Sequence, residues 1–145
     1  MFKHLLVSTD GSALSEAAIQ MAVTFAKESG ARVTGLHVIP EFHVLAYGTE
    51  MIADEEERVI ESARQRADEY LAVFAKAAAQ AGVECASVAT SHAHPYEAII
   101  HVATERNCDL IVMASHGRRG MRSLLLGSET QKVLTHSRIP VLVVR

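Results

Sequence analysis

The chain has 145 residues and a mass of 15.7 kDa, and 49% of its residues are apolar while 21% are charged. This is the size and balance of a globular protein with a buried core, so a disordered chain is excluded and a single domain over residues 1–145 is expected. The formal net charge of -3 and the pI near 6.2 give no general positive field, so nucleic acid is not expected as a partner.

The first apolar stretch, Leu5–Val7, is too short for a signal-peptide core or a membrane span, so we expect a cytoplasmic protein without membrane contact. It reads as a buried strand that ends in the turn Ser8–Ser12. A helix is predicted next, because the apolar positions repeat every 3.6 residues, and Gly30 is a natural end for it. These positions are Leu14, Ala17, Ala18, Met21, Ala22, Phe25 and Ala26.

The β-branched stretch Val33–Ile39, which ends at Pro40, predicts a second strand. Residues Glu41–Glu50 show no sustained period and are interpreted as a partly packed loop. A long helix is then predicted from about Ile52 to Ala81, with the charged run Asp54–Arg58 as its solvated first turns. Its apolar face consists of Val59, Ala63, Ala67, Tyr70, Phe74 and Ala78, and Gly82 ends it.

The second half of the chain continues the alternation. Val83–Thr90 is predicted as an edge strand, and a helix follows in which Pro95 occupies the first turn. Asp109–Ala114 is a continuous apolar run, as in a central strand buried on both faces. A helix near Ser128–His136 and a strand at Pro140–Val144 complete the pattern.

Five strands alternating with four helices imply an α/β protein with a doubly wound parallel sheet of the Rossmann-like type, for which we expect the strand order 3-2-1-4-5. Ligands of such sheets bind at the carboxyl ends of the strands, where the winding reverses. The turns after Val7 and after Met113 are therefore the places where a site is expected.

A glycine-rich segment, Ala114–Gly120, follows the central strand, and Gly127-Ser128 opens the last helix. Glycines let backbone N–H groups approach a phosphate, and a helix amino terminus adds free donors. Arg118, Arg119 and Arg122 add local positive charge. The alternative is purely structural, because glycines also mark turns and Ser128 with Gln131 fits a capping box.

These segments resemble the universal stress protein family. The resemblance rests on four motifs, in this order: Thr9–Ser12, Leu36–Val38, Ser115–Gly117 separated by nine residues from Gly127-Ser128, and Pro140–Val144. It implies a protein that binds ATP or a related adenine nucleotide with Mg²⁺, in a regulatory or protective role in the stress response. It also implies a homodimer through Pro140–Val144, which would cover an exposed apolar sheet edge.

Members that bind ATP carry glycine, two residues, glycine, nine residues, and glycine followed by serine or threonine. This chain fits from Gly117 onward, but Ala114 replaces the first glycine. Whether alanine is tolerated depends on whether this position requires a positive φ or merely a small side chain against the ribose. The candidate nucleotide-binding residues are Thr9, Asp10, Val38, Ala114, His116, Gly117, Gly127, Ser128 and Glu129.

The resemblance implies that Asp10 contacts the ribose or a phosphate-bound magnesium, that the backbone of Val38 meets the adenine, and that Gly117, Gly127 and Ser128 cradle phosphates. An Asx-type turn or helix cap is the structural alternative for Asp10, and both roles are compatible. His116 either donates to a phosphate or packs at its turn.

His92 and His94 have no third ligand nearby in the sequence, so they are interpreted as surface or capping residues rather than a zinc site, and no metal site built from protein residues alone is expected. Cys85 and Cys108 lack metal-ligand spacing and lie in apolar or strand-like stretches, which predicts reduced, buried thiols.

Two other functions remain open. A slow ATP or phosphoanhydride hydrolase requires a positioned base, for which Asp10 and His116 are the candidates. A nucleotide-free interaction module of the same fold is favoured by Ala114 and by the apolar last strand. A receiver domain is excluded because Ser8-Thr9 stand where an acidic pair is needed, and a flavodoxin because the chain has no Trp and 5% aromatic residues.

Overall fold

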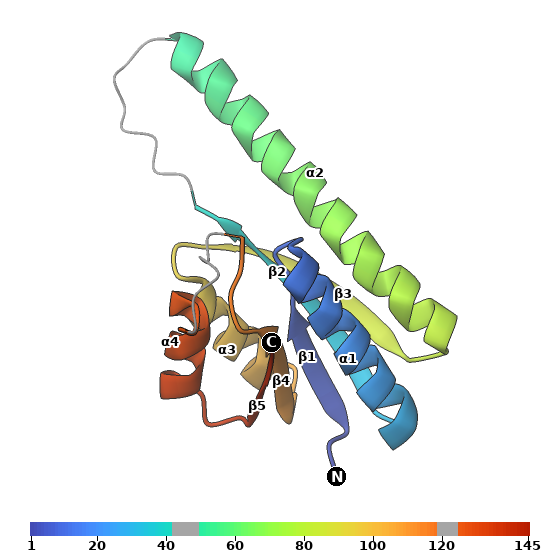
Figure 1. The fold of residues 1–145 in the computed structure, drawn as a ribbon. Coiled ribbons are helices and arrows are strands. Elements are labelled where there is room, and N and C mark those ends of the chain that lie inside the picture. Colours follow the sequence, from blue (N-terminus) through green and yellow to red (C-terminus); the bar gives the residue numbers. More distant parts are fainter. Residues whose placement is uncertain (42–49, 119–124) are drawn as a thin grey trace.

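The computed structural model describes residues 1–41, 50–118 and 125–145. Most of the expected loop Glu41–Glu50 lies outside these residues, as do Arg119 and Arg122. Strands and helices alternate along the chain (Figure 1). In order they are β1 (His4–Ser8), α1 (Ala13–Ser29), β2 (Arg32–Pro40), α2 (Glu50–Ala81), β3 (Cys85–His92), α3 (Pro95–Glu105), β4 (Leu110–Ala114), α4 (Ser128–His136) and β5 (Val141–Val144).

The five strands form one parallel sheet with the order β3-β2-β1-β4-β5, which confirms the predicted fold class and strand order. The winding reverses between β1 and β4, where Leu5 pairs with Leu110 and Val7 with Val112. The carboxyl ends of these two strands therefore lie side by side, as the fold class requires of a switch point.

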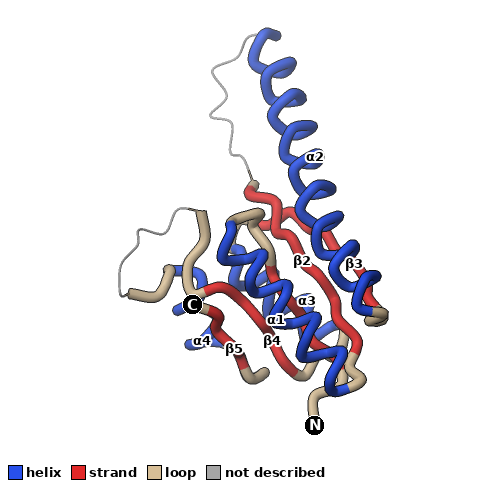
Figure 2. The backbone as a smooth tube through the Cα atoms, turned by 45° about the vertical axis from the view of Figure 1, so that its right-hand side comes forward, coloured by secondary structure: helices blue, strands red, loops and turns tan. Residues whose placement is uncertain are grey.

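Helices cover both faces of the sheet, with α1 and α2 on one face and α3 and α4 on the other (Figures 1 and 2). The alternation of side chains along a strand divides the core accordingly. Leu5 and Val7 pack in the cluster that holds Ile19 of α1 and Phe74 of α2. Leu6 packs in the cluster on the α3 and α4 side, and all three β1 residues are fully buried.

Local sequence signals set the helix ends. The Ser12 side chain accepts a hydrogen bond from the Ser15 N–H and caps α1. Gly30 ends α1 with φ 71° and Gly82 follows α2 with φ 70°, conformations that glycine adopts without steric cost. Pro95 lies in the first turn of α3, where its missing N–H costs no helical hydrogen bond.

Three sequence expectations about burial are wrong. Met21 of the expected apolar stripe is 48% exposed, because the buried residues of α1 lie on the other side of that helix. Cys85 is exposed, because β3 is an edge strand whose first residues face solvent, whereas Cys108 is buried. Val59 is 40% exposed, because the first half of α2 projects past the end of the sheet (Figure 1). The predicted apolar face of α2 becomes buried from Ala63 onward.

Within the described ranges, none of the helices combines the length and the apolar character that crossing a membrane requires.

Candidate functional site

The turns after β1 and β4 meet at the carboxylate of Asp10. Its Oδ2 accepts a hydrogen bond from the Arg118 N–H at 2.9 Å, and its Oδ1 accepts one from the Ser12 N–H at 3.0 Å. The second bond is the Asx-type turn that the sequence offered as an alternative. Asp10 therefore stabilises its own turn and also joins two turns that are 108 residues apart in the chain.

The hydrogen bonds at Asp10 favour its ionised form. Burial alone would raise the pKa of this carboxyl, but hydrogen bonds from Ser12, Arg118 and Ser15 outweigh burial and hold the pKa below its ordinary value. Asp10 therefore carries a negative charge at neutral pH, and it is a weak proton acceptor.

Thr9 is buried and holds the same turn from inside. Its N–H donates to the Leu36 carbonyl at 2.9 Å, and its hydroxyl lies 3.1 Å from the Ser15 hydroxyl and accepts from the Gly11 N–H at 3.2 Å. Its carbonyl accepts a hydrogen bond from His37 Nδ1 at 2.8 Å. The Thr9 side chain thus stabilises the turn after β1 through its hydroxyl contacts.

Two glycines let the turns approach each other closely. A β-carbon on Gly117 would overlap Oδ2 of Asp10, so only glycine allows this contact between the turns. Gly11 has φ 78°, and a β-carbon there would overlap the ring of Tyr70 from α2. The backbone around Asp10 is therefore enclosed by the second turn and by an aromatic ring.

Gly127 brings the start of α4 against the turn that follows β4. Its N–H donates to the Ser115 carbonyl at 2.7 Å, and a β-carbon on it would lie 3.1 Å from His116 Cα. Gly127 is also the residue that precedes the first turn of α4. The first free N–H groups of this helix consequently lie beside the glycine-rich turn.

The capping box that Ser128 and Gln131 offered as a purely structural alternative does not form. No side chain caps this helix, and the Gln131 side-chain amide donates to the Leu126 carbonyl at 2.8 Å instead of reaching back to the cap. The Ser128 side chain is exposed and makes no hydrogen bond within the described part of the chain. Its hydroxyl is therefore available to a ligand.

Ala114 occupies the last position of β4 in an extended conformation. It pairs with Val144 of β5, and its carbonyl accepts a hydrogen bond from the Thr130 hydroxyl at 2.9 Å. Among the described non-glycine residues, Asn107 is the one with a positive φ. The position of Ala114 therefore does not demand glycine for conformational reasons, and alanine causes no backbone strain there.

His116 and Val38 border the same edge of the sheet. The His116 ring is half-buried, and its Nδ1 lies 3.2 Å from the Ser115 hydroxyl. Pairing between β1 and β2 ends at Leu36, and the backbone groups of alternate residues point to the same side of a strand. The backbone of Val38 therefore points past the end of β1, toward the region in front of the two turns.

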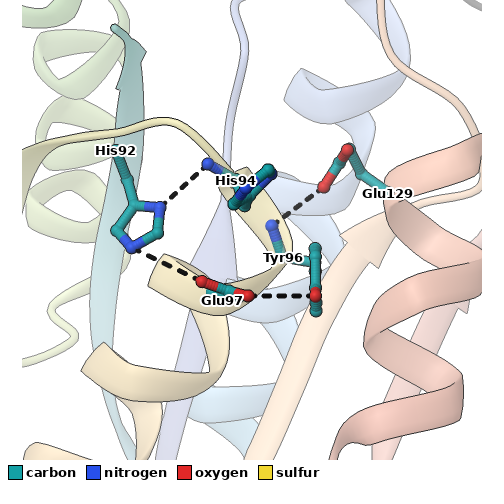
Figure 3. A network of polar contacts seen from close by, with 5 residues as sticks. All are labelled: His92, His94, Tyr96, Glu97 and Glu129. Atoms are coloured by element: carbon teal, nitrogen blue, oxygen red, sulfur yellow. Dashed lines mark hydrogen bonds and ion pairs between the residues drawn. The ribbon is translucent and has the colours of Figure 1, made fainter.

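The side chain of Glu129 is directed to α3. Its Oε2 accepts a hydrogen bond from the Tyr96 N–H at 2.9 Å (Figure 3). Its Oε1 lies 3.7 Å from Lys132 Nζ. His92 Nδ1 accepts a hydrogen bond from the His94 N–H at 2.9 Å (Figure 3), but no side chain caps α3, so these two histidines are surface residues at its start rather than caps. Glu129 thus offers a ligand its backbone rather than its carboxylate, and the described residues contain no group of three potential metal ligands.

Two residues that the sequence analysis did not assign to the site lie against it. His37 is buried and hydrogen-bonded to Thr9, and the Tyr70 ring packs edge-on against it at 5.1 Å between centroids. The Arg118 guanidinium carbon lies 5.2 Å from the Tyr70 ring centroid. The sequence signal for Tyr70 was a polar hydroxyl on the apolar face of α2, but the partners of its ring come from distant segments.

Two cavities lie elsewhere in the described structure. One of about 260 Å³ lies at the amino ends of the strands, between Arg32, Cys85 and Arg106, and one of about 590 Å³ lies between α1 and α2. Neither is lined by Asp10 or by the glycine-rich turn. The candidate site is therefore assigned from its convergent backbone donors and close glycine contacts. These features indicate a particular kind of ligand, whereas the volume of a cavity alone does not.

The fold and site define a doubly wound α/β protein with a glycine-rich turn at the switch point. A model of the Universal stress protein family matches residues 1–145. The universal stress protein YxiE of Bacillus subtilis is 35% identical over 149 residues, covering 100% of both chains. A universal stress protein of Thermus aquaticus is 33% identical over 148 residues, again covering 100% of both. The chain belongs to the universal stress protein family.

Solved structures agree with this assignment. Protein MJ0577 of Methanocaldococcus jannaschii superimposes with a TM-score of 0.83 at 28% identity, covering 99% of this chain and 96% of that one. Universal stress protein UspA of Lactobacillus plantarum gives a TM-score of 0.84 at 24% identity, covering 99% and 98%.

Proposed function

We propose that this chain binds an adenine nucleotide, ATP with Mg²⁺, at the carboxyl ends of β1 and β4, in a regulatory or protective role in the stress response. The observation that carries the proposal is the meeting of Asp10, Gly117 and the start of α4 at the switch point of the sheet. This place combines glycine-framed backbone, free helix N–H groups and a carboxylate, which are the groups that nucleotide phosphates and ribose require.

Each part of the nucleotide has a matching surface. The backbone of Val38 would meet the adenine, and Asp10 would contact the ribose or a magnesium ion carried by the phosphates. Gly117, Gly127, Ser128 and the backbone of Glu129 would cradle the phosphates, with Thr9 and His116 supporting the turns on either side. The extended conformation of Ala114 supports the proposal, because the departure from the glycine pattern adds one methyl group without strain.

Structural neighbours include a universal stress protein in complex with cAMP, at 23% identity and a TM-score of 0.73, and one from Archaeoglobus fulgidus in complex with dAMP, at 19% and 0.69. At these levels of identity, the similarity shows a shared fold and nothing about the ligand of this chain. The case for an adenine nucleotide in this chain therefore depends on its own residues at the switch point.

Binding rather than catalysis fits the site best. Hydrolysis requires a base that can take a proton from water. Both oxygens of Asp10 already accept backbone hydrogen bonds, and the lowered pKa of this carboxyl makes it a poor base. Any ATP hydrolysis is therefore expected to be slow, and a nucleotide-free interaction module is the alternative if no binding is found.

We further propose a single-domain, cytoplasmic homodimer that pairs through β5. This strand lies at the edge of the sheet and presents the half-buried apolar residues Val141–Val144, an arrangement that proteins usually cover. A charge at this edge, as in Leu142→Lys, should convert a dimer to monomer or aggregate in light scattering, and an unchanged dimer would argue against pairing here.

The proposal is tested by calorimetric titration of nucleotide-stripped protein with ATP and magnesium. Saturable binding is expected and should be lost in Gly127→Val, which places a side chain in the phosphate cradle. Because this change also crowds His116, Ser128→Ala is the matched variant. It removes a hydroxyl that caps nothing, so it should weaken binding while the melting temperature stays the same. No binding to the intact protein would contradict the proposal.

A further inference from the structure

Arg118 carries a positive charge at the mouth of the candidate site, and within residues 1–41, 50–118 and 125–145 no carboxylate forms an ion pair with it. Its N–H is bound to Asp10 Oδ2, but none of the ion pairs among the described residues involves its guanidinium. The guanidinium instead lies over the ring of Tyr70, with 5.2 Å between its central carbon and the ring centroid. This is the geometry of a cation–π contact.

The Tyr70 ring is held in place by two contacts. It projects from α2 onto the turn after β1, so closely that Gly11 cannot carry a side chain. It also packs edge-on against His37, with 5.1 Å between the ring centroids and an angle of 76° between the rings. His37 is itself buried and donates a hydrogen bond to the Thr9 carbonyl. The Tyr70 ring beneath Arg118 is therefore packed against a fixed, buried side chain.

We propose that Tyr70 is a positioning residue that holds the Arg118 guanidinium beside the Asp10 turn, where it binds the phosphates of a nucleotide. The inference rests on the proposed function, since it assigns a further phosphate-binding group to the same site. The Arg118 side chain is exposed, and an exposed cation–π contact is weaker than a charge-assisted hydrogen bond to phosphate. A cation–π contact uses the face of the guanidinium and leaves its in-plane N–H groups free to donate to a phosphate, while the Tyr70 ring and the backbone bond to Asp10 hold the residue in place.

The arrangement has a specific consequence for ligand preference. Arg118 follows Gly117, which is assigned to the phosphates, whereas the adenine is assigned to Val38 at the other side of the site. Loss of the arginine or of its platform should therefore reduce the gain in affinity from adenosine to AMP to ATP, and leave the affinity for adenosine unchanged. A general weakening of the fold would instead lower all three affinities together.

The test is a calorimetric titration of the full chain with adenosine, AMP and ATP with magnesium at one fixed ionic strength. Compared with the unaltered protein, Arg118→Gln should lower the ATP-to-adenosine affinity ratio about tenfold, the effect of losing one charge-assisted contact. Tyr70→Leu should lower it about three- to fivefold, the size of an exposed cation–π contact. Tyr70→Phe, which keeps the aromatic face, should restore the ratio, and Tyr70→Leu should add nothing to Arg118→Gln.

The outcomes separate this inference from the proposed function. If the unaltered protein binds none of the three ligands, the proposed function fails, and the inference fails with it. If it binds ATP, but Arg118→Gln leaves the ratio unchanged, only the role of Arg118 is overturned. Equal loss for adenosine and ATP in Tyr70→Leu, or no recovery in Tyr70→Phe, would overturn the positioning role of Tyr70. Because Arg118 is exposed, its variant tests the inference even if Tyr70→Leu does not fold.

Discussion

Substitution of Gly11 by alanine tests the close contact between the turn after β1 and helix α2. Gly11 has φ 78°, which disfavours any L-residue, and a β-carbon there would overlap the Tyr70 ring. Gly30 provides a matched control, because it has a similar φ of 71° but no atom within 4 Å of the position its β-carbon would take. The two substitutions therefore share the backbone cost and differ in the steric one.

The expected destabilisation of each variant follows from its backbone cost and its steric cost. A left-handed conformation costs a non-glycine residue about 1 kcal/mol, which is the whole effect expected for Gly30→Ala. Overpacking adds about 1–3 kcal/mol, so Gly11→Ala should lower the free energy of unfolding by about 2–4 kcal/mol. The extra cost arises because Tyr70 must leave its contacts with His37 and Arg118.

Urea denaturation of both variants measures the difference directly. Introducing the same two substitutions into a Tyr70→Ala background removes the overlapping ring, and there the excess cost of Gly11→Ala should disappear. Equal destabilisation by Gly11→Ala and Gly30→Ala in the unaltered background would refute the inference that the Tyr70 ring packs directly against this turn.

Two further predictions concern titratable groups. Burial raises the pKa of the Cys108 thiol to about 11. A thiol reagent at pH 8 should therefore modify the exposed Cys85 at least about tenfold faster than Cys108. Cys85→Ser should remove the fast phase of modification, and persistence of that phase would contradict the assignment. The lowered pKa of Asp10 implies a stabilisation that is complete above its unfolded value of about 3.9 and lost as the pH falls through the folded value. Asp10→Asn should therefore lower the free energy of unfolding by about 1 kcal/mol at pH 7, and by progressively less as the pH falls below about 3.9, measured by urea denaturation; a difference independent of pH would contradict this account.

Local signals were sufficient to predict the sheet and the ends of its helices. The apolar runs at Leu5–Val7 and Asp109–Ala114 predict buried strands because central parallel strands are covered on both faces. Gly30 and Gly82 predict helix ends because both adopt a left-handed conformation that other residues disfavour. The switch point follows from the order of the elements, so the meeting of the turns after β1 and β4 was also predictable.

Features that depend on side-chain contacts between distant segments were not predictable. The exposure of Cys85 and Val59 depends on where the sheet ends relative to β3 and α2. The ring of Tyr70 fits one face of an amphipathic helix, but nothing local indicates that it rests on Gly11.

Capping shows the same limit. Ser128 and Gln131 have capping-box spacing, yet the Gln131 amide binds the Leu126 carbonyl, and Glu129 instead binds the Tyr96 N–H at the start of α3. Such choices depend on which acceptors the tertiary structure brings within reach.

The central claim, that the carboxyl ends of β1 and β4 form a nucleotide site, is tested most directly by mapping amide chemical shifts of the isotope-labelled protein during titration with ATP and magnesium. The account predicts saturable shifts that are largest at Asp10, Gly117, Gly127 and Ser128. Absence of shifts, or shifts centred on the cavity between Arg32 and Arg106 at the opposite end of the sheet, would contradict it.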